Sequence, residues 1–243
     1  MVAAAIFNVG MNALAGAGIL FDTQTGAVSD SVQTGVTPAG WAFSIWSLIF
    51  VGVLVFAAWQ ARPAARQARY DALALPFIAA NLLNGLWQVP WLMRLFGVAA
   101  VVIVGILASL AVLYVRLDRM PLRGPERWAL GVPVSLFLAW LTVATPLNLT
   151  VAFSAAGWTD PGPLWPVLLL LVVGAVGAWL LSRTADVAIA GVLVWAFVAV
   201  WAKNGGAELT VGLVLGAVLF LGGLVAGLRR GLSPWPTAHA EAR

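Results

Sequence analysis

Long apolar segments with almost no charged residues recur along this chain and constrain its fold more than any other feature. Residues 97–116, for example, consist almost entirely of Val, Ile, Leu, Ala and Gly. A transmembrane helix needs about 20 consecutive, mainly apolar residues. Charged residues make up only 9% of the chain, whereas an average globular domain has roughly 25%. Mean hydropathy is +0.99. The sequence therefore predicts an all-α polytopic membrane protein.

Eight segments of this kind are long enough to span a bilayer, and polar or basic connections separate them. The first segment could also be a cleaved signal peptide, although it lacks the basic region with which such peptides begin. Asn8 and Asn12 lie one helical turn apart in this segment, so we expect both amides to face a neighbouring helix. The predicted spans are residues 1–21, 41–60, 72–92, 97–116, 128–151, 164–182, 187–202 and 209–228.

The basic residues alternate between the two sides that these spans define. With the amino terminus inside, 11 of them lie in inner loops and the tail, and only Arg94 and Lys203 lie outside. The positive-inside rule expects this asymmetry, so the high pI does not require a nucleic-acid partner. We expect a multi-pass protein of the bacterial plasma membrane with both termini cytoplasmic. The inner set is Arg62, Arg66, Arg69, Arg116, Arg119, Arg123, Arg127, Arg183, Arg229, Arg230 and Arg243.

Reactive and metal-ligating side chains are nearly absent from the predicted spans. Asp186, Lys203 and Glu208 fall at span boundaries, and no Asp, Glu, Lys, Arg or His lies deep in a span. The chain has no cysteine, and its one histidine, His239, is in the tail. Proton pumps and ion-coupled carriers usually need an ionisable group inside the membrane. We therefore expect no metal site, no required cofactor and no catalytic residue of the acid, base or nucleophile type.

Indole and carboxamide side chains gather at one depth in three of the predicted spans. In the third span, Asn84 and Gln88 are four residues apart and share a helical face. Such a set of flat aromatic rings and neutral polar groups suits a pocket for a planar, largely apolar ligand. The members are Trp41 and Trp46 in the second span, Asn84, Trp87 and Gln88 in the third, and Trp140, Ala144 and Asn148 in the fifth.

Many of the tryptophans also have a simpler explanation that involves no ligand. Indole rings favour both membrane interfaces, so tryptophans at span ends form a belt that needs no ligand. Asn84 and Asn148 could likewise serve only to bond neighbouring helices. Gly212 with Gly216, and Gly223 with Gly227, have the spacing that lets two helix backbones approach closely, which indicates packing. The tryptophans at predicted span ends are Trp41, Trp59, Trp91, Trp128, Trp158, Trp165 and Trp201.

Three segments resemble the TspO/MBR family of tryptophan-rich sensory or translocator proteins. They are TPAGWAFSIWSLIF at 37–50, NLLNGLWQVPW at 81–91 and PVSLFLAWLTVATPLN at 133–148. The resemblance covers residues 1–155 and implies a five-helix membrane bundle there. Residues 156–228 would then be three additional transmembrane helices, and residues 229–243 a polar cytoplasmic tail. The sequence departs from the family in its Pro-Ala-Gly turn, where the family has Pro-Pro-Gly, and in these additional spans.

The resemblance also implies a pocket between helices and the kind of ligand it holds. Members of the family bind porphyrins and other tetrapyrroles, sterols and benzodiazepine-type drugs. The pocket residues carried over by position are Trp41, Phe43, Trp46, Asn84, Trp87, Trp140, Ala144 and Asn148. All but Phe43 also belong to the cluster found from depth alone.

These observations favour a sensor, regulator or carrier that binds a planar hydrophobic ligand, porphyrin-like or sterol-like, in an outer-leaflet pocket. A transporter or permease for a small neutral solute is the first alternative. A light-dependent porphyrin-degrading enzyme is the second, and we favour a non-enzymatic role over it. The expected partners are the lipid bilayer and the ligand, and a homodimer is left open.

Overall fold

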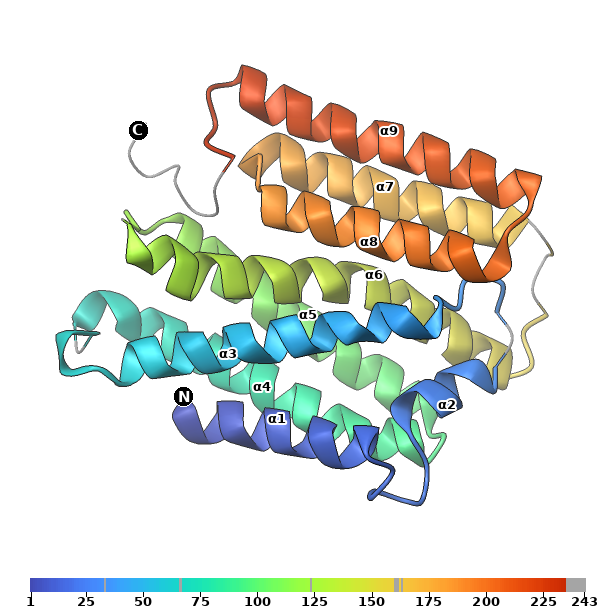
Figure 1. The fold of residues 1–243 in the computed structure, drawn as a ribbon, viewed down its shortest axis with the longest axis horizontal. Helices are drawn as coiled ribbons and strands as arrows, with labels where there is room; N and C mark the ends of the chain where they lie inside the picture. Colours follow the sequence, from blue (N-terminus) through green and yellow to red (C-terminus); the bar gives the residue numbers. More distant parts are fainter. Residues whose placement is uncertain (33, 66, 123, 160–161, 163, 235–243) are drawn as a thin grey trace.

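The computed structural model describes residues 1–32, 34–65, 67–122, 124–159, 162 and 164–234, and these residues contain helices and turns without a strand (Figure 1). Four short turns of 3-10 or π type precede the helices α3, α4 and α6: η1 (Gly40–Ser44), η2 (Pro63–Ala65), η3 (Ala68–Tyr70) and η4 (Arg127–Gly131). The α-helices are α1 (Val2–Gly16), α2 (Thr25–Asp30), α3 (Ile45–Ala61), α4 (Asp71–Leu92), α5 (Phe96–Asp118), α6 (Val132–Ala155), α7 (Leu164–Thr184), α8 (Val187–Asn204) and α9 (Ala207–Arg229).

Among these described residues, seven helices are long and apolar enough to cross a membrane, and α1 is a shorter apolar helix. The chain is thus an all-α polytopic membrane protein, as predicted. The first predicted span was too long, because α1 ends at Gly16 instead of near residue 21. The backbone turns at Gly18, Phe21 and Asp22, which all have positive φ. At 1.5 Å per residue α1 is roughly 22 Å long, less than the roughly 30 Å apolar core of a bilayer.

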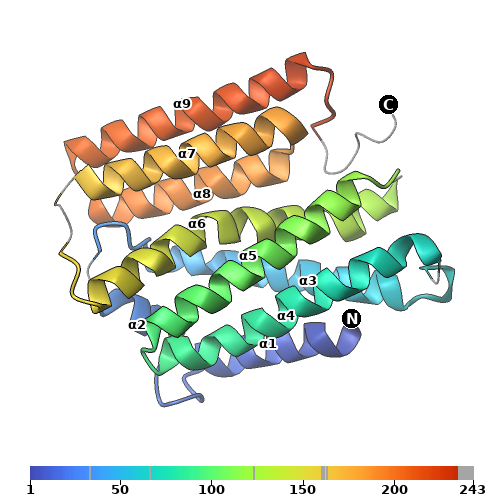
Figure 2. The same ribbon diagram turned by 180° about the vertical axis from the view of Figure 1, so that it is seen from behind.

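The spanning helices run nearly parallel or antiparallel and form two groups (Figures 1 and 2). We call α1 and α3–α6 the five-helix unit, and α7–α9 the three-helix unit. Helix α6 lies between them and packs against α3 and α5 on one side and α8 on the other. The short α2 lies across one end of the five-helix unit, which we call the α2 end. Of the predicted tail, residues 229–243, the positions 235–243 lie outside the described residues.

Glycines allow α7 and α9 to pack with their backbones in contact. A Cβ atom added at Gly223 would lie 2.3 Å from the carbonyl oxygen of Ala178, and one at Gly174 would lie 2.7 Å from the Cα of Gly216. Neither distance is sterically allowed, so these positions exclude any side chain. The packing role expected for the glycine pairs of α9 is therefore confirmed.

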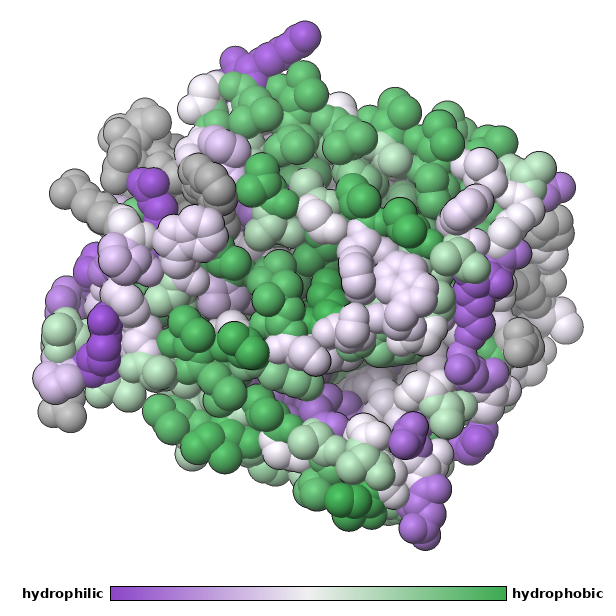
Figure 3. Space-filling model, in the orientation of Figure 1, coloured by the Kyte–Doolittle hydropathy of each residue, from purple (hydrophilic) through white to green (hydrophobic). Residues whose placement is uncertain are grey.

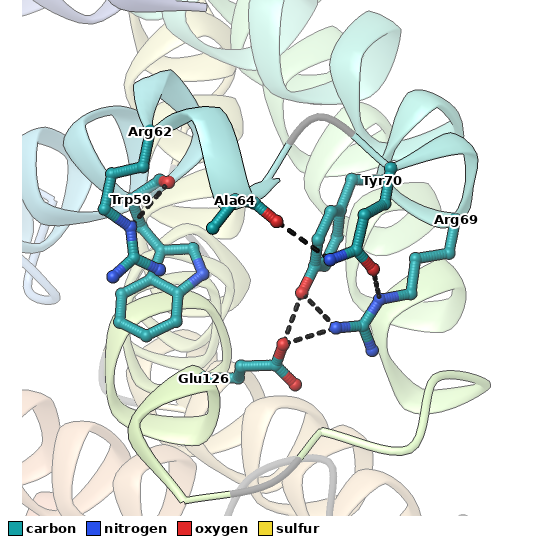
Figure 4. Close-up of polar contacts among 7 residues, drawn as sticks. Trp59, Arg62, Ala64, Arg69, Tyr70 and Glu126 are labelled. Carbon is teal, nitrogen blue, oxygen red and sulfur yellow. Dashed lines mark hydrogen bonds and ion pairs between the residues drawn. The ribbon is translucent and has the colours of Figure 1, made fainter.

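Most basic side chains lie at the end of the bundle opposite α2. There the connection between α3 and α4 is fixed to the segment before α6 by a cluster around Glu126 (Figure 4). Arg69 forms an ion pair of 2.5 Å with Glu126, and the hydroxyl of Tyr70 donates to the same carboxylate. The guanidinium of Arg62 lies 3.3 Å from the ring centre of Trp59. The bonds to Glu126 join the α3–α4 connection to the segment before α6 across this polar end.

Candidate functional site

A cavity lies inside the five-helix unit near the α2 end, where α3, α4 and α6 converge below α2 and the segment that follows it. Its walls combine aromatic and aliphatic side chains with a few hydroxyl and amide groups. The lining residues are Thr25, Ser29, Thr34, Thr37, Pro38, Phe43, Trp46, Asn84, Trp87, Trp91, Ile103, Trp140, Leu141, Ala144, Leu147, Asn148 and Val151.

The structure brings seven of the eight candidate pocket residues to this cavity. They are Phe43, Trp46, Asn84, Trp87, Trp140, Ala144 and Asn148. The eighth, Trp41, does not line it. Its side chain is 45% exposed, and its ring packs edge-on against Trp195 of α8 with the ring centres 4.7 Å apart. Ligand binding by the seven remains a prediction.

The aromatic rings of the cavity pack against one another in both edge-to-face and stacked pairs. Trp140 of α6 is the centre of this arrangement, with its ring centre 6.2 Å from that of Trp46 and 6.4 Å from that of Phe43. Both pairs are edge-to-face, a favourable geometry for aromatic quadrupoles. On α4, the ring of Trp87 stacks on that of Trp91 with the ring centres 4.9 Å apart. The walls therefore offer flat apolar surfaces in several orientations.

Trp91 is a cavity residue that sequence reasoning assigned to the interfacial belt. Its side chain is only 3% exposed, and its indole N–H donates to the carbonyl oxygen of Thr25 in α2 at 3.1 Å. The signal for its true position was its spacing, since Trp91 follows Trp87 by four residues and therefore shares its helical face. The hydroxyl residues of the cavity, such as Thr25 of α2 and Thr34 after it, come from a stretch that the sequence indicated only as a polar loop.

Hydrogen bonds already engage most polar groups around the cavity. The indole N–H of Trp87 donates to Asn148 Oδ1 at 3.2 Å, and the Asn148 amide donates to the carbonyl oxygen of Ala144. Trp140 differs, because its buried Nε1 has no hydrogen-bond partner within the described parts of the chain. A buried donor without a partner costs free energy. An acceptor brought by a ligand would remove that cost.

A chain of carboxamides beside the cavity joins α1 to α4. Asn8 donates to Asn81 Oδ1 at 2.8 Å and accepts from Asn84 at 2.7 Å. Asn12 donates to Asn8, and its own oxygen accepts from Gln88 at 2.5 Å. The prediction that Asn8 and Asn12 face a neighbouring helix is confirmed. The network fixes Asn84 in place through the oxygen atom of Asn8.

The cavity is small in this conformation, with a volume of about 50 Å³. A buried water needs about 10–15 Å³, so the space suits only a few waters. Pockets for drug-sized ligands usually measure about 300–1,000 Å³. A planar ring system would therefore require the cavity to open.

A family profile described as TSPO-like protein matches residues 1–228 of the chain. The chain belongs to the TSPO-like protein family. The match reaches the last turn of α9, so it includes the three-helix unit as well as the residues 1–155 on which the sequence resemblance was based. Searches of curated proteins and of solved structures found no match. The TSPO-like chain is an integral, multi-pass membrane protein, in agreement with its seven long apolar helices.

This TSPO-like protein also has an apolar groove between its two units. The groove lies among α3, α6 and α8, has a volume of about 400 Å³, and is lined by side chains that include Leu48, Leu136 and Trp195. Apolar side chains dominate the face on which α3 and α8 lie (Figure 3). A surface of this composition suits contact with lipid chains.

Asp186, which links α7 to α8, is a buried carboxyl group in this TSPO-like protein. The sequence placed it correctly at a span boundary but gave no sign that it is 0% exposed. One carboxylate oxygen accepts from Ser135 of α6 at 2.6 Å and from Tyr114 of α5 at 3.2 Å. The other accepts from the backbone N–H groups of Ala188 and Ile189, which caps the start of α8. Asp186 therefore ties α8 to the five-helix unit at the end opposite α2.

Proposed function

We propose that this TSPO-like protein binds a planar, largely apolar ligand of the tetrapyrrole or sterol type in the cavity and acts as its sensor or carrier. The observation that carries the proposal is the convergence of Trp46, Trp87 and Trp140, from three different helices, on one hollow. Flat indole walls with a few fixed polar groups are typical of sites for such ligands.

The unpartnered N–H of Trp140 narrows the class of ligand. A molecule with a carbonyl, carboxylate or ether oxygen at its edge would give this donor its missing acceptor. None of the described ionisable side chains lines the cavity, so such an oxygen would meet the Trp140 N–H without a charged partner. A porphyrin, with an apolar ring and carboxylates at its edge, offers both the flat surface and the acceptor.

We further propose that the protein lies in a bacterial plasma membrane with both termini in the cytoplasm. The charge distribution supports this orientation, because Arg62, Arg116 and Arg183 lie at the ends of α3, α5 and α7 that are opposite α2. At the α2 end, Arg94 bonds to Ser31 and Lys203 pairs with Asp30. Loops rich in Lys and Arg remain on the cytoplasmic side. The cavity would then open toward the outer leaflet.

Titration of the detergent-solubilised protein with protoporphyrin IX tests the function, with the porphyrin absorption band as the readout. We expect saturable binding. Trp140→Phe keeps an aromatic ring but removes the donor, so it should weaken binding by about two- to tenfold, the value of one hydrogen bond. Trp140→Ala also removes the wall and should weaken binding further.

Trp179→Phe is the matched control, because Trp179 is on α7 and 62% exposed. It should bind porphyrin as the unaltered protein does. Unsaturable uptake that is equal in all variants would mean that the porphyrin only partitions into detergent, and it would refute the proposed site.

A further inference from the structure

The cavity is covered at the α2 end by residues 34–44, which we call the roof segment. Thr34, Thr37 and Pro38 of this segment line the cavity directly, and Phe43 follows them in η1. Since the cavity volume is only about 50 Å³, this cover is closed over a space too small for a planar ligand. Opening of the cavity on this side would require the roof segment to move.

Three hydrogen bonds attach the roof segment to α8 of the three-helix unit. The backbone N–H of Ala39 donates to the carbonyl oxygen of Ala199 at 2.9 Å. The side-chain amide of Asn204 donates to the carbonyl oxygen of Thr37 at 2.9 Å, and the indole N–H of Trp195 donates to that of Ala42 at 3.1 Å. Backbone polar groups in an apolar setting need partners, and α8 provides them here.

Apolar contacts with the three-helix unit add to these bonds. The side chain of Val36 is 1% exposed and reaches a hollow bordered by Val143 of α6 and Phe197 of α8. Gly35 lies under Pro166 of α7 with positive φ, and a Cβ added there would be 2.9 Å from the proline ring. Trp41, the predicted pocket residue that lies outside the cavity, packs its ring on Trp195.

The other side of the cavity mouth has a different support. Helix α2 is attached to α4 within the five-helix unit, through the bond from Trp91 to the carbonyl of Thr25 and through a 2.7 Å bond from the Thr25 hydroxyl to Gln88. Two elements thus cover the cavity at this end: α2, which is held by α4 and by an ion pair between Asp30 and Lys203 at the exposed rim, and the roof segment, which is held by α8. Asp186 anchors the far end of α8, so the roof contacts can break without α8 leaving its place.

We infer that α8 keeps the cavity closed, and that Trp195 and Asn204 are positioning residues whose bonds to the roof segment set how readily a ligand enters. The inference rests on the proposed ligand cavity. It assigns to the three-helix unit a role in the site, although the residues that line the cavity come from the five-helix unit, from α2 and from the segment between α2 and α3.

A cysteine at Ala144 can report opening without any ligand, because Ala144 lines the cavity and the chain has no other cysteine. The rate at which a small soluble maleimide labels Ala144→Cys in detergent measures how often the cavity opens. Adding Trp195→Phe, which removes one N–H and keeps a ring, should raise this rate about two- to tenfold, as expected for one lost hydrogen bond. Asn204→Ala should raise it by a similar factor.

Trp201→Phe is the matched control. Trp201 is also on α8, but its N–H donates to Thr210 of α9 at 2.9 Å, within the three-helix unit. This variant should leave the labelling rate unchanged. The inference would be overturned if Trp195→Phe and Trp201→Phe gave equal labelling rates. It would also be overturned if neither Trp195→Phe nor Asn204→Ala raised the labelling rate.

Protoporphyrin binding is measured separately on the same variants. If the porphyrin fails to bind while the labelling rates follow the pattern above, the proposed function is wrong and the role of α8 stands. If the porphyrin binds but the labelling rate does not respond to Trp195→Phe or Asn204→Ala, the inference about α8 is wrong. The cavity would then open on the side where α2 is bonded to α4.

Discussion

Asp186 shows how one residue outside the cavity can join parts of a membrane protein. Its carboxylate accepts hydrogen bonds from three elements, through Tyr114, Ser135 and the first turn of α8. Burial raises the pKa of Asp186 above its ordinary value, and the hydrogen bonds from Ser135 and the α8 backbone oppose this effect. Since the folded protein holds this proton more tightly than the unfolded chain does, the group favours folding most at low pH.

The pH dependence of stability therefore has a definite sign. The contribution of Asp186 to the free energy of unfolding is fully present below the ordinary aspartate pKa of about 3.9 and is lost as pH rises through the raised pKa. Asp186→Asn keeps the cap and an acceptor, so it should remove this pH dependence. At pH 7 the melting temperature of this variant should equal or exceed that of the unaltered protein. Melting curves in detergent from pH 4.5 to 7.5 measure it.

Asp186→Ala is the contrasting variant, because it leaves Ser135, Tyr114 and the α8 amides without their acceptor. We expect a loss of about 2 kcal/mol or more at every pH in that range. A similar melting temperature for the Ala and Asn variants would show that these bonds add little.

At the scale of elements, backbone contact between α7 and α9 builds the three-helix unit. Lipid surrounds transmembrane helices with apolar groups, so helix association depends on close packing more than on removing apolar surface from water. Gly174, Gly216 and Gly223 provide that packing, because each lies where an added Cβ would meet backbone atoms of the facing helix. Helix α8 packs against both of these helices and carries the hydrogen bonds to the roof segment.

Substitutions at two adjacent glycines of α9 distinguish the effect of close packing on stability from that of helix propensity. Gly223→Ala would place a Cβ 2.3 Å from the Ala178 oxygen and should destabilise the protein by about 1–3 kcal/mol, the usual cost of overpacking. Gly222→Ala meets nothing within 4 Å and should be neutral or slightly stabilising, because Ala favours helix. Thermal unfolding in detergent compares them, and equal melting temperatures would contradict close α7–α9 packing.

For the whole molecule, α8 is attached near both of its ends to elements outside the three-helix unit. Asp186 attaches it to α5 and α6 at one end, and Trp195 and Asn204 attach it to the roof segment toward the other. An ion pair between Lys203 and Asp30 adds a link from α8 to α2 at the exposed rim. The three-helix unit is therefore built into the fold that positions the cavity, in agreement with a family match that extends to residue 228.

The orientation of the whole molecule can be tested with two exposed alanines at opposite ends. Ala156 follows α6 at the α2 end, and Ala64 lies between α3 and α4. In this cysteine-free chain, a membrane-impermeant maleimide should label Ala156→Cys in intact bacterial cells and Ala64→Cys only after lysis. The reverse pattern would place the cavity mouth at the cytoplasmic side.

The sequence by itself determined the class of protein, the approximate spans and three of the helices that line the cavity. These properties are local, because segment length, hydropathy and the spacing of Trp and Asn on one helix face can be read without knowing the partner helix. Only the tertiary structure placed Trp41 outside the cavity and Trp91 inside it, buried Asp186 and closed the cavity to about 50 Å³. These features depend on contacts between distant parts of the chain, such as that between Thr37 and Asn204, which are 167 residues apart. A local sequence pattern does not contain the information needed to predict such a contact.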